Sequence, residues 1–144
     1  DLGAFLKEVV KFVKMDPAFP PSVKMALHVP NYPILAPIDP DLLKSALLNL
    51  LFNAVQAMPD GGILSLSLFK QEGCCQIAIG DTGIGIDEEI LPLLFSPNFT
   101  TKKKANGLGL VEAEKIMKAH LGSIDIRSQK GIGSTFTLTL PVKR

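Results

Sequence analysis

Apolar residues recur at helical spacing in two long stretches of the first half of the chain. Residues 2–15, LGAFLKEVVKFVKM, show this period and end before Pro17. A second, longer stretch begins at a capping residue, Asp39 or Asp41, and runs to about Met58. The pattern therefore predicts two helices, one at the start of the chain and one after a proline-rich segment.

Short or alternating apolar runs predict strands. VKMALHV at 23–29 is typical of a strand, and the segment after it must be loop or short edge strand because each of its prolines lacks a backbone donor. The turn sequence PDGG at 59–62 leads into ILSLSLFK, which alternates strictly enough to be a strand with one buried face. CQIAIG at 75–80 is predicted to form the next strand. The prolines of the loop are Pro30, Pro33, Pro37 and Pro40.

After these strands the sequence predicts a short helix, a mobile loop and a long helix. Asp87 can cap the short helix, DEEILPLLF, with Glu88 and Glu89 favourably placed in its first turn. Residues 96–106 are polar and lysine-rich without any period, so they are predicted to form a mobile loop. The long helix is predicted over VEAEKIMKAH, beginning near Val111.

The chain is predicted to close with a β-hairpin, formed by SIDIRS and STFTLTL around the turn sequence GIG. Helices and strands are therefore mixed, which favours a mixed sheet covered on one face by helices, that is, a two-layer α/β sandwich. At 144 residues the chain has the length of one ordinary domain, so residues 1–144 are predicted to form a single domain.

Composition and charge exclude several classes of function. A net charge of +1 argues against a dedicated nucleic-acid binder. The longest apolar runs fall short of the ~20 residues that a membrane span needs, and no signal-peptide pattern opens the chain. The only cysteines, Cys74 and Cys75, are neighbours, which provides neither a disulfide framework nor a zinc site and fits a reducing cytosol. Because the chain starts at Asp1 rather than Met, we expect a fragment of a larger protein, whose own localisation can differ.

The second helix carries two asparagines in an otherwise apolar run, LLNLLFNAVQAM. Asn49 and Asn53 are four residues apart, about one helical turn, so they share one stripe of the helix. Asparagine is a poor helix former, and buried amides cost free energy unless their polar atoms are paired. Two interpretations stay open here: the amides face water, or they face a ligand. The polar stripe comprises Ser45, Asn49, Asn53 and Gln56, opposite Leu43, Leu47, Leu50 and Ala54.

A glycine-rich turn, GDTGIGI at 80–86, places Asp81 at the end of a predicted strand. Gly83 and Gly85 permit a tight turn and close approach of the backbone to a bound group. The carboxylate offers acceptor oxygens that suit the exocyclic amine of adenine, whereas guanine presents an acceptor at that place. The turn is therefore either an adenine-selective binding site or an ordinary Asp-Thr-Gly turn without a ligand.

The sequence ANGLGL at 105–110 joins the lysine-rich loop to the predicted start of the long helix. Free backbone N–H groups at a helix N-terminus, with small glycines around them, suit a phosphate. Lys102, Lys103 and Lys104 could add positive charge, although loop lysines are more often solvated surface. The chain lacks both GxxxxGK[ST] and GxGxxG, which excludes ordinary P-loop and Rossmann sites.

Together, NLLFNA, DTGIGI, LFSPNFTTK and GLGL, in this order and at these distances, resemble the N, G1, F and G2 boxes of the histidine-kinase catalytic, ATP-binding domain. The resemblance covers residues from about 1 to 141. It implies the Bergerat ATP-binding fold of the GHKL superfamily, shared with gyrase-type ATPases, Hsp90 and MutL, which agrees with the layers predicted above. It also implies ATP and Mg²⁺ as cofactors.

The resemblance further implies a role for each matching residue. Asn53 would coordinate the Mg²⁺ that bridges the ATP phosphates, assisted by Asn49, and these two are the implied catalytic residues. Asp81 would bind the adenine amine, and Phe95 and Phe99 would anchor the ATP lid. The full set implied to bind the nucleotide is Asn49, Asn53, Gln56, Asp81, Gly83, Gly85, Ile86, Phe95, Phe99, Thr100, Thr101, Lys102, Gly107, Leu108, Gly109, Leu110 and Thr135.

Two places depart from the family pattern. Ala105 and Asn106 precede GLGL where the usual sequence is GTGLGL, which puts the detail of the lid hinge and one backbone phosphate contact in question. Gln56 stands where a basic residue often follows the N box. One cationic phosphate contact is therefore missing or is supplied by a lid lysine.

Asn49 favours a kinase over the other members of the superfamily. Gyrase-type ATPases and anti-sigma serine kinases place a glutamate there as general base, and an amide cannot accept that proton. His28 and His120 are predicted to be structural, because neither lies in an HExxNP-like context. The alternatives are a GHKL-type ATPase, an anti-sigma serine kinase, or a nucleotide-binding module with degenerate catalysis.

The sequence therefore predicts the catalytic half of a sensor histidine kinase, which binds Mg-ATP and donates its γ-phosphate to a histidine on a separate phosphoacceptor and dimerisation domain. Transfer would be mostly positioning and charge neutralisation. The implied partners are that domain of the same kinase and the receiver domain of a response regulator, with no nucleic acid. We expect the fragment to be a cytoplasmic monomer and its parent a homodimer, whether or not the parent is membrane-bound.

Overall fold

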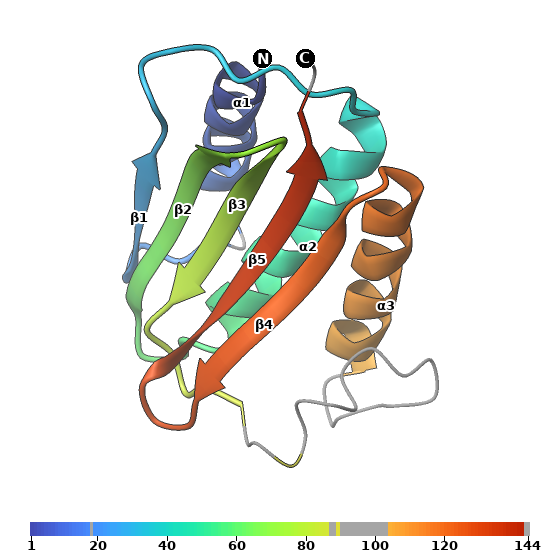
Figure 1. Cartoon of the computed structure of the whole chain (residues 1–144). Coiled ribbons are helices and arrows are strands. Elements are labelled where there is room, and N and C mark those ends of the chain that lie inside the picture. The colour runs from blue at the N-terminus through green and yellow to red at the C-terminus, as the bar shows by residue number, and fades with distance from the viewer. Residues whose placement is uncertain (18, 87–88, 90–103, 143–144) are drawn as a thin grey trace.

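A computed structural model describes residues 1–17, 19–86, 89 and 104–142, with the backbone alone for 104–109. The elements in chain order are α1 Leu2–Met15, β1 Val23–His28, α2 Pro40–Gln56, β2 Gly62–Gln71, β3 Cys74–Asp81, α3 Lys104–Ala119, β4 Ser123–Gln129 and β5 Gly133–Pro141. The strands form one sheet, and α1, α2 and α3 lie against one of its faces (Figure 1). The predicted two-layer α/β sandwich is therefore confirmed.

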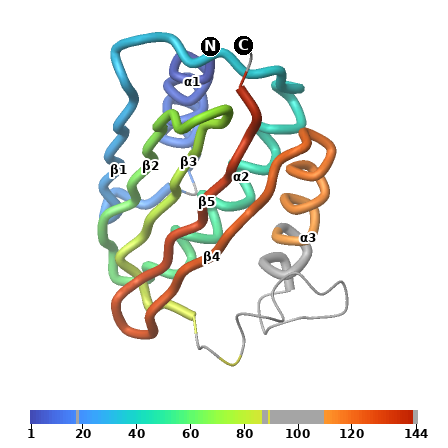
Figure 2. The backbone as a smooth tube through the Cα atoms, viewed as in Figure 1, coloured from blue at the N-terminus to red at the C-terminus, as the bar shows by residue number. Residues whose placement is uncertain are grey.

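The sheet is mixed, with its strands in the order β1-β2-β3-β5-β4. β1 pairs with β2 in parallel, and the other neighbouring pairs are antiparallel. The register of β3 and β5 sets Asp81 opposite Ser134. Figure 2 shows the same arrangement as a tube, with α2 and α3 neighbouring each other behind the sheet. The end of β3 therefore lies beside the beginning of β5 and its turn from β4.

The first two helices begin at aspartate caps. The Asp1 carboxylate accepts a hydrogen bond from the N–H of Gly3 at 2.9 Å. The Asp39 carboxylate accepts one from the N–H of Asp41 at 3.1 Å, and Pro40 occupies the first turn of α2, where its missing N–H costs nothing. Of the two candidate caps for α2, Asp39 is the N-cap. Pro40, which was predicted to lie in the loop, is therefore the first residue of the helix.

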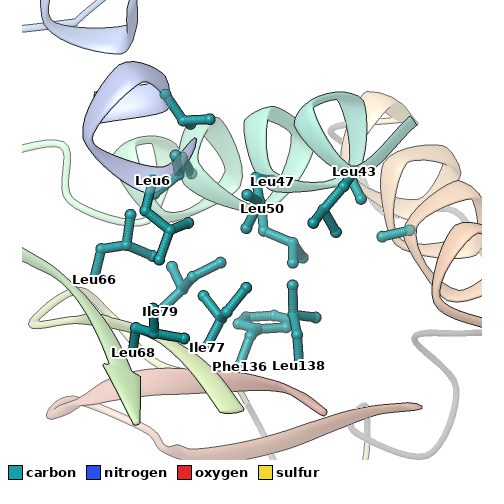
Figure 3. Close-up of a cluster of buried hydrophobic side chains, with 14 of the residues drawn as sticks. Leu6, Leu43, Leu47, Leu50, Leu66, Leu68, Ile77, Ile79, Phe136 and Leu138 are labelled. Atoms are coloured by element: carbon teal, nitrogen blue, oxygen red, sulfur yellow. The ribbon is translucent and has the colours of Figure 1, made fainter. Parts of the chain in front are cut away.

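The core lies between the sheet and the helices. Every second residue of β3 is buried, and β5 shows the same alternation. α2 packs Leu43, Leu47 and Leu50 toward these strand side chains (Figure 3). Burying one such aliphatic side chain stabilises the fold by roughly 1.5–3 kcal/mol, so this layer is a principal source of stability. The strand residues that Figure 3 labels in this layer are Leu66, Leu68, Ile77, Ile79, Phe136 and Leu138.

The opposite face of the sheet carries mainly small polar side chains. Ser65 and Ser67 on β2, and Thr135, Thr137 and Thr139 on β5, alternate with the buried residues and are partly exposed. The helices cover one face because only that face is apolar. The prediction that ILSLSLFK forms a strand with one buried face is confirmed.

The two cysteines and the apolar segments singled out in the sequence have clear places in the fold. Cys74 and Cys75 are both free, and burial raises the pKa of the Cys75 thiol to about 11, with the neighbouring Cys74 adding to the shift. Cys75 is therefore a packed core residue rather than a reactive thiol. In the part of the chain that the structure describes, no helix combines the length and the hydropathy that a membrane crossing requires.

The predicted start of the last helix is also wrong. The loop predicted to extend through Asn106 and the helix start predicted near Val111 are contradicted by α3, which begins at Lys104. The remaining elements follow the prediction within a few residues, including the closing hairpin of β4 and β5. The short helix predicted at Asp87, and residues 96–103 of the predicted loop, lie outside the described residues.

The early start of α3 has a physical explanation. Ala105, Leu108 and Leu110 are good helix formers, whereas Gly107 and Gly109 each cost about 1 kcal/mol in a helix relative to alanine. The prediction gave these two glycines too much weight, because packing offsets their cost. Three residues of α3 that are buried in the core show this packing: Leu110, Ala113 and Met117.

Candidate nucleotide-binding site

The second half of α2 presents Asn49 and Asn53, which are both partly buried, whereas Gln56 is exposed. Among the described residues, the Nδ2 of Asn53 is a buried side-chain donor without a hydrogen-bond partner. Leaving a buried donor unpaired costs roughly 1–3 kcal/mol, so stability of the fold does not explain this amide. The ligand-facing interpretation of the polar stripe is therefore favoured over the solvated one.

The Asn53 amide has the right chemistry for phosphates and a hard cation. Its NH₂ group requires an acceptor, such as a phosphate oxygen. If the carboxamide were rotated by half a turn about its bond to Cβ, Oδ1 would take the place of Nδ2. An amide oxygen can coordinate Mg²⁺, which keeps several water ligands as well. The described residues contain no cluster of three His, Cys, Asp or Glu side chains that could hold a metal ion by themselves. A metal at this place would thus depend on amide oxygens, phosphates and water.

Asp81 ends β3 with its carboxylate almost fully buried. Its exposed fraction is 9%, and its Oδ1 accepts a hydrogen bond from the N–H of Gly83 at 2.9 Å. Burial raises the pKa of Asp81, while hydrogen bonds from the backbone of Gly83 and Ser134 act in the opposite direction. A buried carboxylate has lone pairs beyond those these two donors occupy, so it can accept a hydrogen bond from a ligand.

The glycine-rich turn packs directly on the end of α2. A Cβ placed on Gly83 would lie 2.2 Å from the carbonyl oxygen of Ala57. The same carbonyl accepts a hydrogen bond from the N–H of Ile84 at 3.0 Å. The N–H of Ala57 in turn donates to the carbonyl of Asn53 at 3.1 Å. This close contact requires glycine at position 83 and brings the turn after Asp81 next to the helical turn that carries Asn53.

The far side of the glycine-rich turn is joined to the turn between β4 and β5. Gly85 has a φ of +74°, and a Cβ on it would lie 2.3 Å from the carbonyl oxygen of Gln129. The N–H of Gly131 donates to the carbonyl of Ile84 at 2.7 Å, and the N–H of Ile86 donates to Ser128 Oγ at 2.6 Å. The segment is therefore fixed between α2 on one side and the hairpin on the other.

Three further residues predicted to bind the nucleotide differ in where their side chains lie. Ile86 is partly buried and packs against the core, and Leu110 is a buried core residue of α3. Thr135 faces the open side of the sheet, because a Cβ on its cross-strand neighbour Gly80 would lie 3.7 Å from Thr135 Oγ1. Asp81 faces the core side, so the structure does not bring Thr135 together with it.

The other members of the predicted set lie either outside the described residues or within α3. Phe95, Phe99, Thr100, Thr101 and Lys102 lie outside the described residues. Gly107, Leu108 and Gly109 lie within α3, so the free N–H groups at its start belong to the residues that follow Lys104 rather than to those after GLGL. The predicted helix start near Val111 is wrong, and phosphate binding at the start of this helix stays a prediction.

Sequence reasoning missed Ser128 and Ser134. Ser134 lies opposite Asp81 in the register of β3 and β5, and its backbone hydrogen-bonds the Asp81 carboxylate. Strand alternation gave a usable signal: because Phe136 is apolar and buried, Ser134 shares its face and Thr135 does not. The sequence provided no comparable signal for Ser128, because its hydrogen-bond partner Ile86 is 42 positions away.

Comparison with known protein families places the chain in a class of ATPases. A family described as histidine kinase-, DNA gyrase B-, and HSP90-like ATPase matches residues 38–144. Because this match covers most of the chain, the chain belongs to that family.

Sequence relatives narrow the class to the catalytic domains of sensor histidine kinases. The chain is 44% identical over 104 residues to the sensor histidine kinase ZraS of Escherichia coli K12, covering 72% of this chain and 22% of ZraS. It is 44% identical over 111 residues to the signal transduction histidine-protein kinase AtoS of the same organism, covering 75% of this chain and 18% of AtoS. The chain thus spans about a fifth of the length of these relatives, and the predicted class is confirmed.

Solved structures agree with the fold. The catalytic domain of the histidine kinase ThkA superposes with a TM-score of 0.83 at 27% identity, covering 97% of this chain and 91% of that one. The mycobacterial sensor histidine kinase MprB gives a TM-score of 0.83 at 23% identity, covering 99% and 95%. Full-length ShkA in complex with AMPPNP gives 0.85 at 24% identity, covering 99% of this chain and 30% of ShkA. The predicted Bergerat fold is confirmed.

Proposed function

We propose that this domain binds Mg-ATP and donates the γ-phosphate to a histidine on a separate phosphoacceptor domain of the same kinase. The observation that carries the proposal is the contact of the turn after Asp81 with the end of α2, which puts a buried carboxylate and a buried, unpaired amide on neighbouring segments. Membership of an ATPase family supports ATP as the nucleotide.

Asp81 is proposed to accept a hydrogen bond from the exocyclic amine of adenine. Its buried position makes this bond selective, because a base that presents an acceptor there leaves two lone-pair groups facing each other without water. Gly83 and Gly85 hold the backbone close to α2 and to the hairpin, so the wall of the pocket would be backbone rather than mobile side chain. ATP is therefore favoured over GTP.

Asn53 is proposed to meet the phosphates and their Mg²⁺, with Asn49 one turn earlier as the second amide. When bound, Mg²⁺ would neutralise negative charge on the phosphates. The amides would orient the phosphate chain, and neither can take up a proton as a general base would. This favours transfer to a nucleophile that is activated elsewhere over hydrolysis by the domain itself.

The chain's own histidines are not proposed as phosphoacceptors. His120 uses both ring nitrogens in hydrogen bonds, with the N–H of Asp39 at 2.9 Å and the carbonyl of Ile116 at 2.8 Å. His28 lies exposed at the end of the edge strand β1. The acceptor histidine is therefore proposed to come from another domain, and the receiver domain of a response regulator is the proposed final acceptor. In isolation the domain is proposed to be a cytoplasmic monomer.

The test is a transfer assay with radiolabelled ATP. The domain is mixed with a separately made phosphoacceptor domain, with and without Mg²⁺, and acid lability of the label identifies phosphohistidine. We expect Mg²⁺-dependent labelling that Asp81→Asn abolishes, together with very slow release of phosphate when the acceptor is left out. Rapid ATP hydrolysis without the acceptor would instead favour the gyrase-type alternative. Mg-ATP binding without labelling of any acceptor would favour a degenerate nucleotide-binding module.

A further inference from the structure

Ser128, near the end of β4, makes three hydrogen bonds through one hydroxyl group. Its Oγ accepts from the N–H of Ile86 at 2.6 Å, lies 2.8 Å from Ser134 Oγ, and lies 3.1 Å from the carbonyl oxygen of Gly133. A hydroxyl has one proton and two lone pairs. All three bonds are therefore satisfied together when Ser128 donates to Gly133 and Ser134 donates to Ser128.

These bonds close a ring around the glycine-rich turn. At the start of the turn, the backbone of Ser134 hydrogen-bonds the Asp81 carboxylate. At its other end, Ile86 is held by Ser128, which also contacts Ser134. A single hydroxyl thus links the two ends of the segment 81–86, although β4 contributes no residue to the predicted nucleotide site.

The middle of the same turn is held by backbone groups. The N–H of Ile84 donates to the carbonyl of Ala57 at 3.0 Å, and the carbonyl of Ile84 accepts from Gly131 at 2.7 Å. Substituting a side chain leaves these bonds in place. Removing the hydroxyl of Ser128 therefore releases one end of the turn while its middle stays attached to α2 and to the hairpin.

We propose that Ser128 is a positioning residue for the nucleotide: its hydroxyl fixes Ile86 relative to Asp81 and so sets the shape of the pocket that receives the base. The inference rests on the proposed ATP-binding function. Ser128 acts through Ile86 and Ser134 and does not itself touch the nucleotide. Without the hydroxyl, the N–H of Ile86 and the hydroxyl of Ser134 each lose a partner, and ordering the turn becomes part of the cost of binding.

The experiment measures the affinity for Mg-ATP by isothermal titration calorimetry at a temperature where circular dichroism shows each variant folded. Ser128→Ala is expected to weaken binding by about ten-fold, the effect of losing one to two hydrogen bonds. Ser128→Thr keeps the hydroxyl and is expected to stay within about two-fold of the parent. The matched control is Ser123→Ala, because Ser123 is an exposed serine at the other end of the same strand, and it is expected to leave the affinity unchanged.

Amide hydrogen exchange in the nucleotide-free domain provides a second readout. Ser128→Ala is expected to speed exchange at Ile86, which loses its acceptor, and also at Gly83, which Ser128 does not contact but which lies on the same turn. A role confined to bracing the hairpin would leave Gly83 unchanged and would lower the melting temperature without changing the affinity. That pattern would overturn the proposal, as would a folded Ser128→Ala variant with the parent's affinity.

Two further outcomes, an unfolded Ser128→Ala variant and a parent domain that does not bind Mg-ATP, can each be interpreted. If Ser128→Ala does not fold, Ser128→Cys fills a similar volume but hydrogen-bonds weakly, and a Cys variant with the parent's affinity would overturn the proposal. If the unsubstituted domain fails to bind Mg-ATP, the proposed function is wrong. Exchange at Gly83 then still decides whether Ser128 fixes the turn, because that measurement needs no nucleotide.

Discussion

The backbone N–H of Asp39 donates a hydrogen bond to the Nε2 of His120 at 2.9 Å, across 81 positions of the sequence. The Nδ1 of the same ring lies 2.8 Å from the carbonyl oxygen of Ile116, so it carries the proton and donates. The neutral imidazole therefore joins the end of α3 to the start of α2. Figure 1 places this junction at the opposite end of the molecule from the end of β3, and it agrees with the structural role that the sequence predicts for His120.

His120→Ala is expected to lower the free energy of unfolding by about 1–2 kcal/mol, because the N–H of Asp39 and the carbonyl of Ile116 lose their shared partner. Urea unfolding followed by circular dichroism measures the change. Affinity for Mg-ATP is expected to be unaffected, since the junction is far from Asp81. The matched control is His28→Ala at an exposed position, and an equal loss in both variants would contradict the junction's role.

Asp81→Asn is expected to separate stability from binding. The amide keeps an acceptor for the N–H of Gly83 and removes a buried charge, so the free energy of unfolding at pH 7 should rise. ATP binding should be lost, because part of the amide presents donors toward the adenine amine. Unfolding and titration experiments on the same samples check both effects, and a destabilised Asn variant would contradict the view that burial of the Asp81 charge is costly.

The difference in unfolding free energy between Asp81→Asn and the parent domain should depend on pH. The ordinary pKa of an aspartate carboxyl is 3.8, and burial raises the pKa of Asp81 above this value in the folded state. The folded domain therefore holds the carboxyl proton of Asp81 more tightly than the unfolded chain does. The stability that Asp81 contributes is therefore present at low pH and is lost as the pH rises through its raised pKa. The gap between Asp81→Asn and the parent should open from about pH 4 upward and then level off. A gap that stays constant with pH would contradict the raised pKa.

Asn53→Ala is expected to remove most of the Mg²⁺ dependence of ATP binding. Alanine deletes the buried, unpaired Nδ2 together with the amide oxygen, so the free energy of unfolding should change by less than about 1 kcal/mol. Calorimetric titrations with Mg²⁺ and with a chelator measure the ratio of the two affinities. A ratio equal to that of the parent would show that Asn53 does not meet the metal. Ser45→Ala is the control, because Ser45 is an exposed polar residue on the same helix that is not among the residues predicted to bind the nucleotide.

Gly83→Ala is expected to damage both fold and site, because a Cβ would lie 2.2 Å from the carbonyl oxygen of Ala57. We expect a loss of about 2–4 kcal/mol of stability and of at least ten-fold in ATP affinity. Gly73→Ala is the control: its φ is +71° with open space around it, so it should cost about 1 kcal/mol by backbone strain and leave affinity unchanged. Thermal melts and titrations compare the two, and an equal effect on affinity would argue against the contact at Ala57.

Local pattern was sufficient to predict most of the fold. Strict alternation in ILSLSLFK is a local signal, and it gave the correct strand. Pro40 was predicted to lie in the loop, whereas it occupies the first turn of α2, where a missing N–H costs nothing. The start of α3 was not predicted, because the local cost of Gly107 and Gly109 is outweighed by packing of residues further along the helix. Tertiary contacts of this kind have no signature within the segment itself.

The residues of the candidate site also fall into two groups, those that local sequence signals could identify and those that only tertiary contacts reveal. Asn53 and Asp81 could be singled out because an amide in an apolar helix and a carboxylate before glycines are unusual in their own segments. Ser128 could not, because its role depends on a contact with Ile86 that only the folded chain creates. Ser134 was missed although strand alternation places it on the buried face of β5, where the strand register sets it beside Asp81.

Cys74 and Pro141 are paired neighbours of β3 and β5 although most of the second half of the chain separates them. The entropy lost on closing such a stretch grows only with the logarithm of its length, and doubling it adds about 0.6 kcal/mol. A longer connection between the elements that lie in this stretch therefore costs little in closure entropy. Formation of this distant pair should instead limit how fast the chain folds. Descendants of this sequence can therefore lengthen the connections between elements, while they must preserve α3, β4 and the two strands that pair.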